Sequence, residues 1–321
     1  MEDQRLEHFM ERIRRGGKIE AADWMPEDYR KLLLKFIQMH GVSEIMGAFP
    51  EKEWVPKAPT LRRKLGIMAK VQDEVGHGQL LLRVAEDLGE PLGVTRDQLI
   101  TDIFTGRTKF HNVFHMASPT WADAGVIGWL VDGAAILSQA ALLDTSYAPY
   151  GRVLKRICAE ESFHMQHGES IVLSLAEGTT LQRQMLQDSV NRWWESLMFF
   201  FGPPEVSNSA RKMMEYRIRE KSNEELRQRF LSRYVPRIHS LGLTIPDDDL
   251  HYDESADVWH YTQPDWERFG KIVRDNTGPK SQERIALRRQ AHEGQAWVRE
   301  AMIRSAAMAV ANANASGGSQ R

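Results

Sequence analysis

Two copies of a Glu-x-x-His pattern constrain this chain more than any other feature of its sequence. They are Glu74 with His77 and Glu161 with His164, and each pair stands within a long stretch rich in leucine, isoleucine, alanine and methionine. On an α-helix, residues three apart project from the same face about one turn apart, so each pair offers a carboxylate and an imidazole to one point. The chain is therefore expected to fold so that the two pairs meet.

Each pair follows another acidic residue that also lies in an apolar segment. Glu44 precedes Glu74 by 30 residues, and Asp132 precedes Glu161 by 29 residues. A helical hairpin of that length returns its second helix beside the first, which would bring each upstream carboxylate to its pair. The sequence thus predicts a set of six metal ligands, namely Glu44, Glu74, His77, Asp132, Glu161 and His164.

Apolar residues recur three and four positions apart in most of the chain, a pattern typical of α-helices. Four such stretches are expected to form a four-helix bundle: 32–46, 61–88, 122–143 and 152–175. Prolines at positions 50, 56 and 59 are expected to break the first connection. Additional helices are expected outside the bundle over 181–200, 210–219 and 223–239.

The C-terminal part has a different character. Residues 246–264 are acidic, aromatic and histidine-rich without a helical period, which predicts a loop with a short hairpin. Residues 283–311 again favour a helix, and 312–321 are expected to fray or to be disordered. We therefore predict an all-α helical domain over 1–245, with a C-terminal extension over 246–321 packed on the same domain.

Composition and charge bear on the location of the protein and on the classes of partner it binds. The chain of 321 residues has 42 basic and 44 acidic residues, so no basic excess indicates nucleic-acid binding. The only cysteine, Cys158, cannot form an intramolecular disulfide, and the N-terminus lacks the pattern of a signal peptide. The most apolar stretch, 124–143, carries Asp132 near its centre, so no membrane span is expected. We predict a cytoplasmic protein without nucleic-acid or membrane partners.

The ligand set indicates which metal the site would hold. Carboxylates and imidazoles without thiolates suit iron or manganese, and we favour two iron ions. A single Glu-x-x-His pattern recurs by chance in a chain with 11 histidines. Two copies with matching upstream acids are different, because four buried carboxylates require cations to offset the cost of burial.

Two further acids directly precede the ligand glutamates. A metal-bound histidine usually donates its other N–H to a carboxylate or a carbonyl. In an antiparallel helix pair, Asp73 would reach His164 and Glu160 would reach His77 from outside the ligand set. The alternative is that both acids are solvated charges on the helix surface, since neighbouring helix positions point about 100° apart.

Lys70 is the unusual residue near the predicted site. It lies four residues before Glu74 on the same helix face, so we count it among the catalytic-site residues. Its ammonium would pair with site carboxylates when metal is absent, and we hypothesise that it weakens metal retention. Unchanged iron stoichiometry in Lys70→Ala after dialysis would contradict this. The alternative is a lysine that extends to solvent.

Several reactions use such a site, and the sequence separates some of them. Radical-generating reductases place a tyrosine four residues after the first ligand histidine, where this chain has Leu81. Storage ferritins are much shorter chains. Both observations favour an oxygenase that binds a large substrate or partners, while a desaturase remains an alternative.

Long sequence blocks resemble the catalytic A subunits of ring 1,2-phenylacetyl-CoA epoxidases, which are ferritin-like bacterial multicomponent di-iron monooxygenases. The blocks are Lys-Val-Gln-Asp-Glu-Val-Gly-His-Gly at 70–78, Gly-Val-Ile-Gly-Trp-Leu-Val-Asp-Gly-Ala-Ala at 125–135 and Glu-Glu-Ser-Phe-His at 160–164. Similarity also extends to 23–26, 58–64, 225–230 and 297–300, so it covers nearly the whole chain. It implies activation of O₂ at two iron ions (Fe²⁺/Fe³⁺) and epoxidation of the aromatic ring of phenylacetyl-CoA in aerobic phenylacetate catabolism.

The resemblance also implies partners. In this family the catalytic chain pairs with a related, non-catalytic helical subunit, is joined by a small bridging subunit, and receives electrons from NAD(P)H through an iron–sulfur flavin reductase. The chain agrees, since one cysteine and no Gly-rich dinucleotide fingerprint leave no place for an internal electron carrier.

Arg107 and Lys109 are candidates for binding the CoA phosphates, the alternative being ordinary solvated loop charges.

Two other functions stay open for the chain. One is an oxygenase or desaturase for another acyl-CoA. The other is a non-catalytic structural subunit of such a complex, which would be expected to lose ligands that are all present here.

Overall fold

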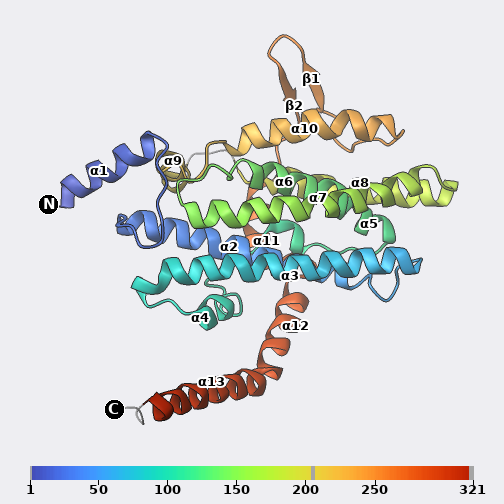
Figure 1. The fold of residues 1–321 in the computed structure, drawn as a ribbon. Helices are drawn as coiled ribbons and strands as arrows, with labels where there is room; N and C mark the ends of the chain where they lie inside the picture. Colours follow the sequence, from blue (N-terminus) through green and yellow to red (C-terminus); the bar gives the residue numbers. More distant parts are fainter. Residues whose placement is uncertain (1, 204–206, 318–321) are drawn as a thin grey trace. The chain divides into compact units, whose positions relative to one another are not determined.

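Four long helical segments run side by side and carry all six predicted ligands (Figure 1). The structure, a computed structural model, describes residues 2–203 and 207–317. It divides into two units, Met1–Ser281 and Gln282–Arg321, and the bundle lies in the first. The predicted all-α, ferritin-like fold is confirmed. The predicted division at residues 245 and 246 stays a prediction.

The first hairpin of the bundle consists of α2 (Glu27–Lys52) and α3 (Leu61–Gly89). Thr60 caps α3, because its side-chain oxygen accepts a hydrogen bond from the backbone N–H of Arg63 at 3.2 Å. The expectation that α2 ends near residue 46 is wrong. The helix continues through Pro50, where the ring removes one backbone hydrogen bond, because residues 41–51 are all buried and their packing offsets that loss.

The second hairpin has an irregular first arm. The expected helix over 122–143 consists of α5 (Trp121–Val126), a π-helical stretch η3 (Ile127–Val131) and α6 (Asp132–Ala140), and it is followed by α7 (Ala148–Ala176). Such π-helical turns occur mostly as short insertions in α-helices, often at functional sites. Here the insertion ends directly before Asp132.

Two facing glycines let η3 and α7 approach each other closely. A Cβ atom on Gly168 would lie 2.2 Å from the carbonyl carbon of Gly128, and one on Gly128 would lie 2.8 Å from the Cα of Gly168. No side chain fits between the two backbones. Their contact therefore sets the distance between the helix that carries Asp132 and the helix that carries His164.

Two outer helices cover the second hairpin. These are α8 (Thr180–Phe200) and α10 (Asn223–Ser240), and both begin with a capping box. Their buried aromatic side chains share one core cluster with Trp129 of η3, and Tyr234 of α10 packs edge-on against that ring at 5.8 Å. The bundle helices thus have an apolar cover on this side.

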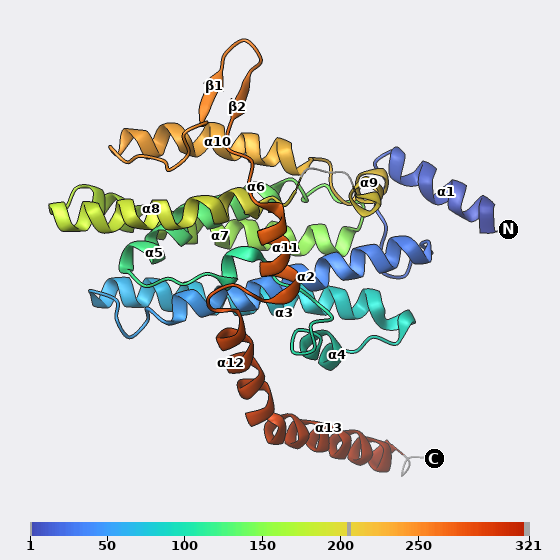
Figure 2. The same cartoon turned by 180° about the vertical axis from the view of Figure 1, so that it is seen from behind.

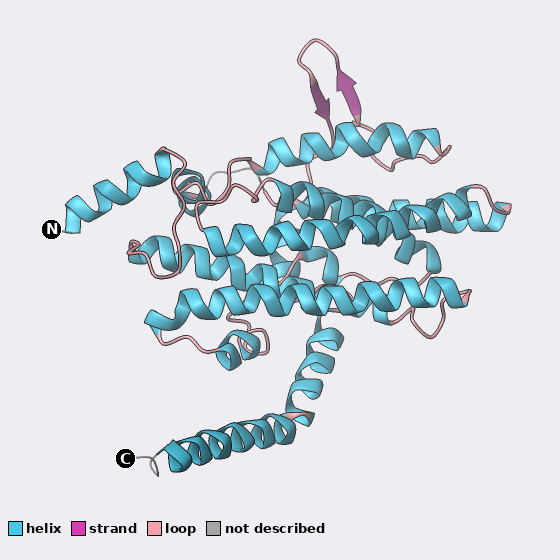
Figure 3. Cartoon of the chain, viewed as in Figure 1, coloured by secondary structure: helices cyan, strands magenta, loops and turns pink. Residues whose placement is uncertain are grey.

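Smaller elements complete the first unit (Figures 2 and 3). The expected hairpin is present as β1 (His251–Asp253) paired antiparallel with β2 (Val258–His260). Figure 2 shows α11 (Trp266–Asp275) crossing the bundle, and the ring of its Phe269 lies 5.5 Å from that of Phe199 in α8. The other elements are α1 (Glu2–Arg14), η1 (Glu90–Leu92), α4 (Arg96–Thr101), η2 (Asn112–His115) and α9 (Asn208–Glu215).

The second unit holds most of α12 (Ser281–Gly294) and α13 (Ala296–Gly317). The helix α13 extends into 312–317, where fraying was expected, and 318–321 lie outside the described residues. Among the helices that the structure describes, none has the length and apolar character needed to cross a bilayer. The cytoplasmic location stays a prediction.

Candidate metal centre

The six predicted ligands meet in the interior of the bundle. One buried group consists of Glu44, Glu74, His77 and Glu161, and a second consists of Asp132, Glu161 and His164. Within each group the potential ligand atoms lie within 4.8 Å of one another. Glu161 belongs to both groups, so its carboxylate would help to hold a cation at either one.

Outer acids orient both imidazole rings. His77 Nε2 lies 2.9 Å from a carboxylate oxygen of Glu160, and His164 Nε2 lies 3.1 Å from one of Asp73. These are the partners that the sequence paired. Since each Nε2 faces an outer carboxylate, each Nδ1 is turned towards the ligand set. A neutral ring that donates from Nε2 would have the lone pair of Nδ1 free for a metal.

The inner nitrogen of His77 has no hydrogen-bond partner, although it is buried. Carboxylate oxygens of Glu161 and Glu44 lie 3.4 and 3.6 Å from it. Burial lowers the pKa of His77, but these two carboxylates raise it to about 10 overall. An unpartnered imidazole nitrogen among acids is the donor arrangement that a hard or borderline cation fits.

Lys70 occupies the other side of the site. Its side chain is 2% exposed, so it does not extend to solvent. Its ammonium lies 2.6 Å from a carboxylate oxygen of Glu51, pairs with Asp132, and lies 4.0 Å from Glu74. Burial lowers the pKa of Lys70, but the carboxylates of Asp132 and Glu51 raise it above its ordinary value. The lysine therefore supplies positive charge within the acidic cluster.

The acids of the site differ in how they hold protons. Burial raises the pKa of Asp132 to about 7, despite the opposing charge of Lys70. Burial and the charge of Glu161 raise the pKa of Glu74 well above its ordinary value. Without a bound cation, part of this cluster is therefore protonated near neutral pH.

Sequence reasoning missed a network behind Glu44. His40 Nε2 lies 2.8 Å from Glu44 Oε1, and the side-chain amide of Gln139 donates to the same oxygen at 3.2 Å. The other nitrogen of His40 lies 2.7 Å from the hydroxyl of Tyr150, whose pKa burial raises well above its ordinary value. The tyrosine therefore donates to His40 and His40 donates to Glu44, which leaves Glu44 Oε2 for the site.

A fourth missed residue is Glu51, which is 2% exposed and unexpected because α2 was predicted to end before it. Helical spacing could have found these residues. His40 precedes Glu44 by four residues, Glu51 follows it by seven, and Gln139 follows Asp132 by seven, so each shares a face with a ligand. For Tyr150 we find no such signal.

A cavity of about 300 Å³ reaches the predicted site from one side. Its lining includes Glu44, Glu74, Asp132 and Glu161. Most of its other walls are apolar, and the aromatic ones are Phe36, Phe110, Phe114, Phe200, Phe201 and Phe269. Partly exposed Arg219 and Lys221 also line it. A flat apolar group would fit between these rings, next to the carboxylates.

The predicted phosphate-binding residues do not line this cavity. Arg107 is exposed and pairs with Asp102 at 2.6 Å, and Lys109 is also exposed. Their role in binding CoA stays a prediction.

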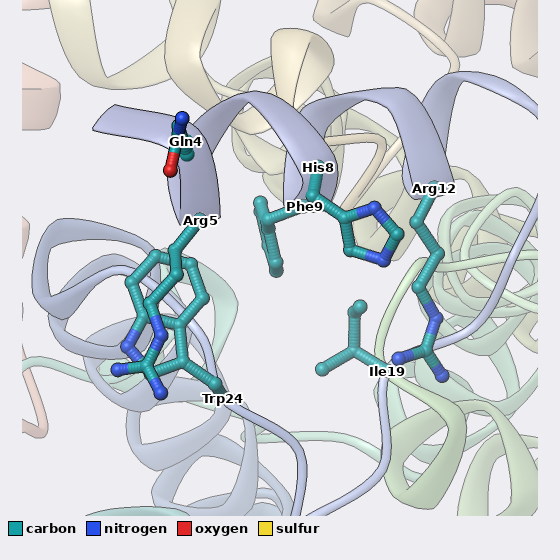
Figure 4. A pocket seen from close by; sticks show the side chains of 7 residues that line it. All are labelled: Gln4, Arg5, His8, Phe9, Arg12, Ile19 and Trp24. Atoms are coloured by element: carbon teal, nitrogen blue, oxygen red, sulfur yellow. The ribbon is translucent and has the colours of Figure 1, made fainter. Parts of the chain in front are cut away.

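Another pocket lies beside α1 (Figure 4). It has a volume of about 440 Å³ and is lined by Gln4, Arg5, His8, Phe9, Arg12, Ile19 and Trp24. The guanidinium of Arg5 stands 5.7 Å from the centre of the Trp24 ring, and Arg12 pairs with Asp23 at 2.8 Å. None of the predicted site residues lines it, so it is separate from the candidate metal centre.

A four-helix bundle that brings four carboxylates and two histidines into its core defines the class of ferritin-like carboxylate–histidine proteins. A family model described as "Phenylacetic acid catabolic protein" matches residues 1–297. The chain is also similar to the A subunit of the 1,2-phenylacetyl-CoA epoxidase of Escherichia coli (strain K12), with 45% identity over 299 residues, 92% of this chain and 95% of the relative. The chain belongs to this phenylacetic acid catabolic protein family, as its sequence blocks predicted.

Proposed function

We propose that this chain is the catalytic oxygenase subunit of a phenylacetyl-CoA 1,2-epoxidase. The observation that carries the proposal is the aromatic-walled cavity whose lining includes four carboxylates of the site. Such a cavity places an aromatic ring next to the centre where oxygen chemistry would occur. The name of the E. coli relative supports the same substrate and reaction.

The six residues Glu44, Glu74, His77, Asp132, Glu161 and His164 would hold two iron ions. When bound, the iron supplies the redox chemistry that activates O₂. The chain itself presents the two Nδ1 atoms, shares Glu161 between the two groups, and holds the rings in place through Asp73 and Glu160. The unpartnered Nδ1 of His77 supports this assignment.

Epoxidation of a ring by O₂ consumes two electrons and two protons and releases one water. We expect the electrons to come from NAD(P)H through a separate iron–sulfur flavin reductase, because the chain has one cysteine and no dinucleotide fingerprint. Two other subunits, the related helical one and the small bridging one, belong to the same proposal. The name of the relative, which is itself one subunit of an enzyme, supports a multi-subunit assembly.

The cavity also provides candidates for orienting the acyl-CoA. The aromatic walls would receive the ring, and Arg219 and Lys221 carry positive charge on a partly exposed part of the lining. CoA phosphates would bind such cations, so these two residues join Arg107 and Lys109 as candidates. Binding energy gained at the phosphates would position the ring without acting on the reacting atoms.

The test is turnover of phenylacetyl-CoA by the complex reconstituted from this chain, its related subunit, iron, O₂ and the reductase, with iron content measured in parallel. We expect Glu74→Ala to lose iron and epoxide formation, whereas the exposed control Glu177→Ala retains both. Iron binding without turnover in the wild type would indicate another acyl-CoA, in an oxygenase or a desaturase. Absence of iron binding would indicate a structural subunit.

A further inference from the structure

The pocket beside α1 carries positive charge and lies apart from the candidate metal centre (Figure 4). Its volume of about 440 Å³ is within the range of small-molecule sites. Arg5, His8 and Arg12 line it, and none of the described residues in its wall is acidic. A negatively charged ligand would therefore meet no repulsion from the lining itself.

The inner wall of this pocket is apolar and is held in place by the bundle. Ile19 is 0% exposed and Phe9 is 2% exposed. The Phe9 ring packs edge-on against the ring of Tyr29 in α2, with 5.1 Å between the ring centres. Trp24 completes the wall and is 38% exposed, so its indole is accessible to a ligand. A flat apolar group would fit against these side chains.

The two arginines differ in how their charge is compensated. Arg12 pairs with Asp23 at 2.8 Å and also donates to the backbone oxygen of Lys18. Arg5 stands over the Trp24 ring, with 5.7 Å between its guanidinium carbon and the ring centre. Among the residues that the structure describes, no carboxylate pairs with Arg5. Arg5 thus brings an uncompensated positive charge to the pocket.

The contact with Trp24 orients Arg5 for an anion. A guanidinium over an aromatic face is held by the ring, while the N–H donors at its edge stay free. A carboxylate accepts two parallel hydrogen bonds from such a group. Figure 4 shows Arg5 and Trp24 on one side of the pocket and Arg12 on the other, with Phe9 and Ile19 between them. A ring lying against Phe9 and Ile19 would therefore bring an attached carboxylate to Arg5.

The balance of charge selects the class of ligand. One uncompensated arginine matches a single negative charge, whereas a polyphosphate would need several cations. A neutral aromatic molecule would leave the guanidinium of Arg5 without a partner. A saturated acid would lose the ring contacts that the Trp24 and Phe9 side chains offer.

We propose that the pocket beside α1 is a binding site for a small aromatic carboxylate. The aromatic ring lies against Phe9, Ile19 and Trp24, the carboxylate binds Arg5, and the imidazole of His8 is a second donor beside it. The wall of the pocket combines residues of α1 with residues 19 and 24, so the bound acid would hold α1 against the bundle. Because none of the candidate metal ligands lines this pocket, the site is independent of the proposed reaction.

The experiment measures binding of 2-naphthoate to the full-length chain labelled with fluorotryptophan, by fluorine NMR. Trp24→Phe assigns the Trp24 signal among those of the 9 tryptophans. No tryptophan is among the described residues that line the cavity beside the metal centre, so binding there leaves the Trp24 signal unmoved. We expect 2-naphthoate to shift the Trp24 signal saturably.

Arg5→Met removes the charge and keeps much of the side-chain length, and we expect it to weaken binding at least tenfold. Arg5→Lys keeps the charge without the planar fork and should lose less than Arg5→Met. Arg14→Met, at an exposed residue of α1 outside the lining, is the matched control and is expected to bind as the wild type does. Two analogues complete the test, the neutral 2-naphthalenemethanol and the saturated decahydro-2-naphthoate, and each should bind at least tenfold more weakly.

Circular dichroism establishes whether the variants fold, and Arg5→Gln replaces Arg5→Met if that variant does not. A wild type whose Trp24 signal does not shift saturably, or wild-type affinity in Arg5→Met, overturns the proposal. Equal affinity for the neutral alcohol would make the pocket a purely apolar site, and equal affinity for the saturated acid would remove the role of the rings. Inorganic phosphate is titrated in parallel, and an equal affinity for it would indicate a general anion site. Each of these three outcomes also overturns the proposal.

Discussion

Replacing Lys70 by methionine tests the electrostatic account of the metal centre. The substitution keeps most of the side-chain volume but removes the ammonium from a cluster in which Glu51 and Asp132 are its close partners. Two unit charges about 4 Å apart interact by about 4 kcal/mol at an effective dielectric constant of about 20. Removing one partner of a buried pair typically costs about 3–5 kcal/mol. We therefore expect the metal-free variant to lose about 4 kcal/mol of unfolding free energy near pH 8.

The loss of unfolding free energy in Lys70→Met should be larger at high pH than at low pH. Without Lys70, the pKa of Asp132 rises further above about 7, and that of Glu51, already raised by burial, rises as well. When folding raises the pKa of a carboxyl group, the folded protein loses stability as pH rises through that raised pKa. The reason is that the buried group must then become charged, which costs more in the folded protein than in the unfolded chain. The difference from the wild type should therefore be smaller at pH 5.5 than at pH 8.

Urea denaturation of the metal-free proteins at both pH values measures this effect, with exposed Lys155→Met as the control. Iron retention after dialysis is the second measurement, and Lys70→Met should retain more iron than the wild type because no ammonium competes for Asp132. A variant with wild-type stability at pH 8, or with a larger loss at pH 5.5, would refute the reasoning. Unchanged iron retention would refute the role of Lys70 as a competitor.

Three further predictions follow from the packing and hydrogen bonds. In the isolated chain, Gly168→Ala should lower the unfolding free energy by about 1–3 kcal/mol, because the added Cβ would lie 2.2 Å from a facing backbone carbon. Gly76→Ala, whose Cβ would meet open space, should instead raise the unfolding free energy by up to about 1 kcal/mol. Denaturant melts measure both variants, and equal effects would contradict the packing argument. His40→Leu should weaken iron binding about 10–100-fold in a chelator competition, because it removes the donor that turns Glu44, and wild-type affinity would exclude that role. Iron loading at pH 7.5 should release protons, because His77, with a pKa of about 10, must become neutral to bind the metal. Calorimetric titration in buffers of different ionisation enthalpy counts the released protons, and zero release would contradict the assignment of His77 as a ligand.

The bundle could be predicted because its signals are local. Helical periodicity and the Glu-x-x-His spacing depend only on residues within a few turns of one another, and the helices α2, α3 and α7 follow them. The family could be predicted for a related reason, since long blocks around the site resemble those of its members, and the comparisons confirm it. The error at the end of α2 came from treating Pro50 as a break when the buried residues around it keep the helix intact.

The arrangement of charged and hydrogen-bonding groups at the site, by contrast, depends on contacts between helices. The pairing of Lys70 with Asp132, the cavity beside the carboxylates, and the chain from Tyr150 through His40 to the site each join residues far apart in sequence. Their positions depend on how closely the backbones approach, as at the facing glycines of η3 and α7.

The sequence by itself thus determined the fold class, the family and the six candidate ligands, because these depend on local periodicity, on spacing and on resemblance. Only the tertiary structure decided that Lys70 turns inwards, that Glu51 joins the acids, and that Glu161 lies between two groups of ligands. The physical reason is that a buried charge is stable only with specific partners. Which partners it meets is set by helix packing rather than by neighbours along the chain.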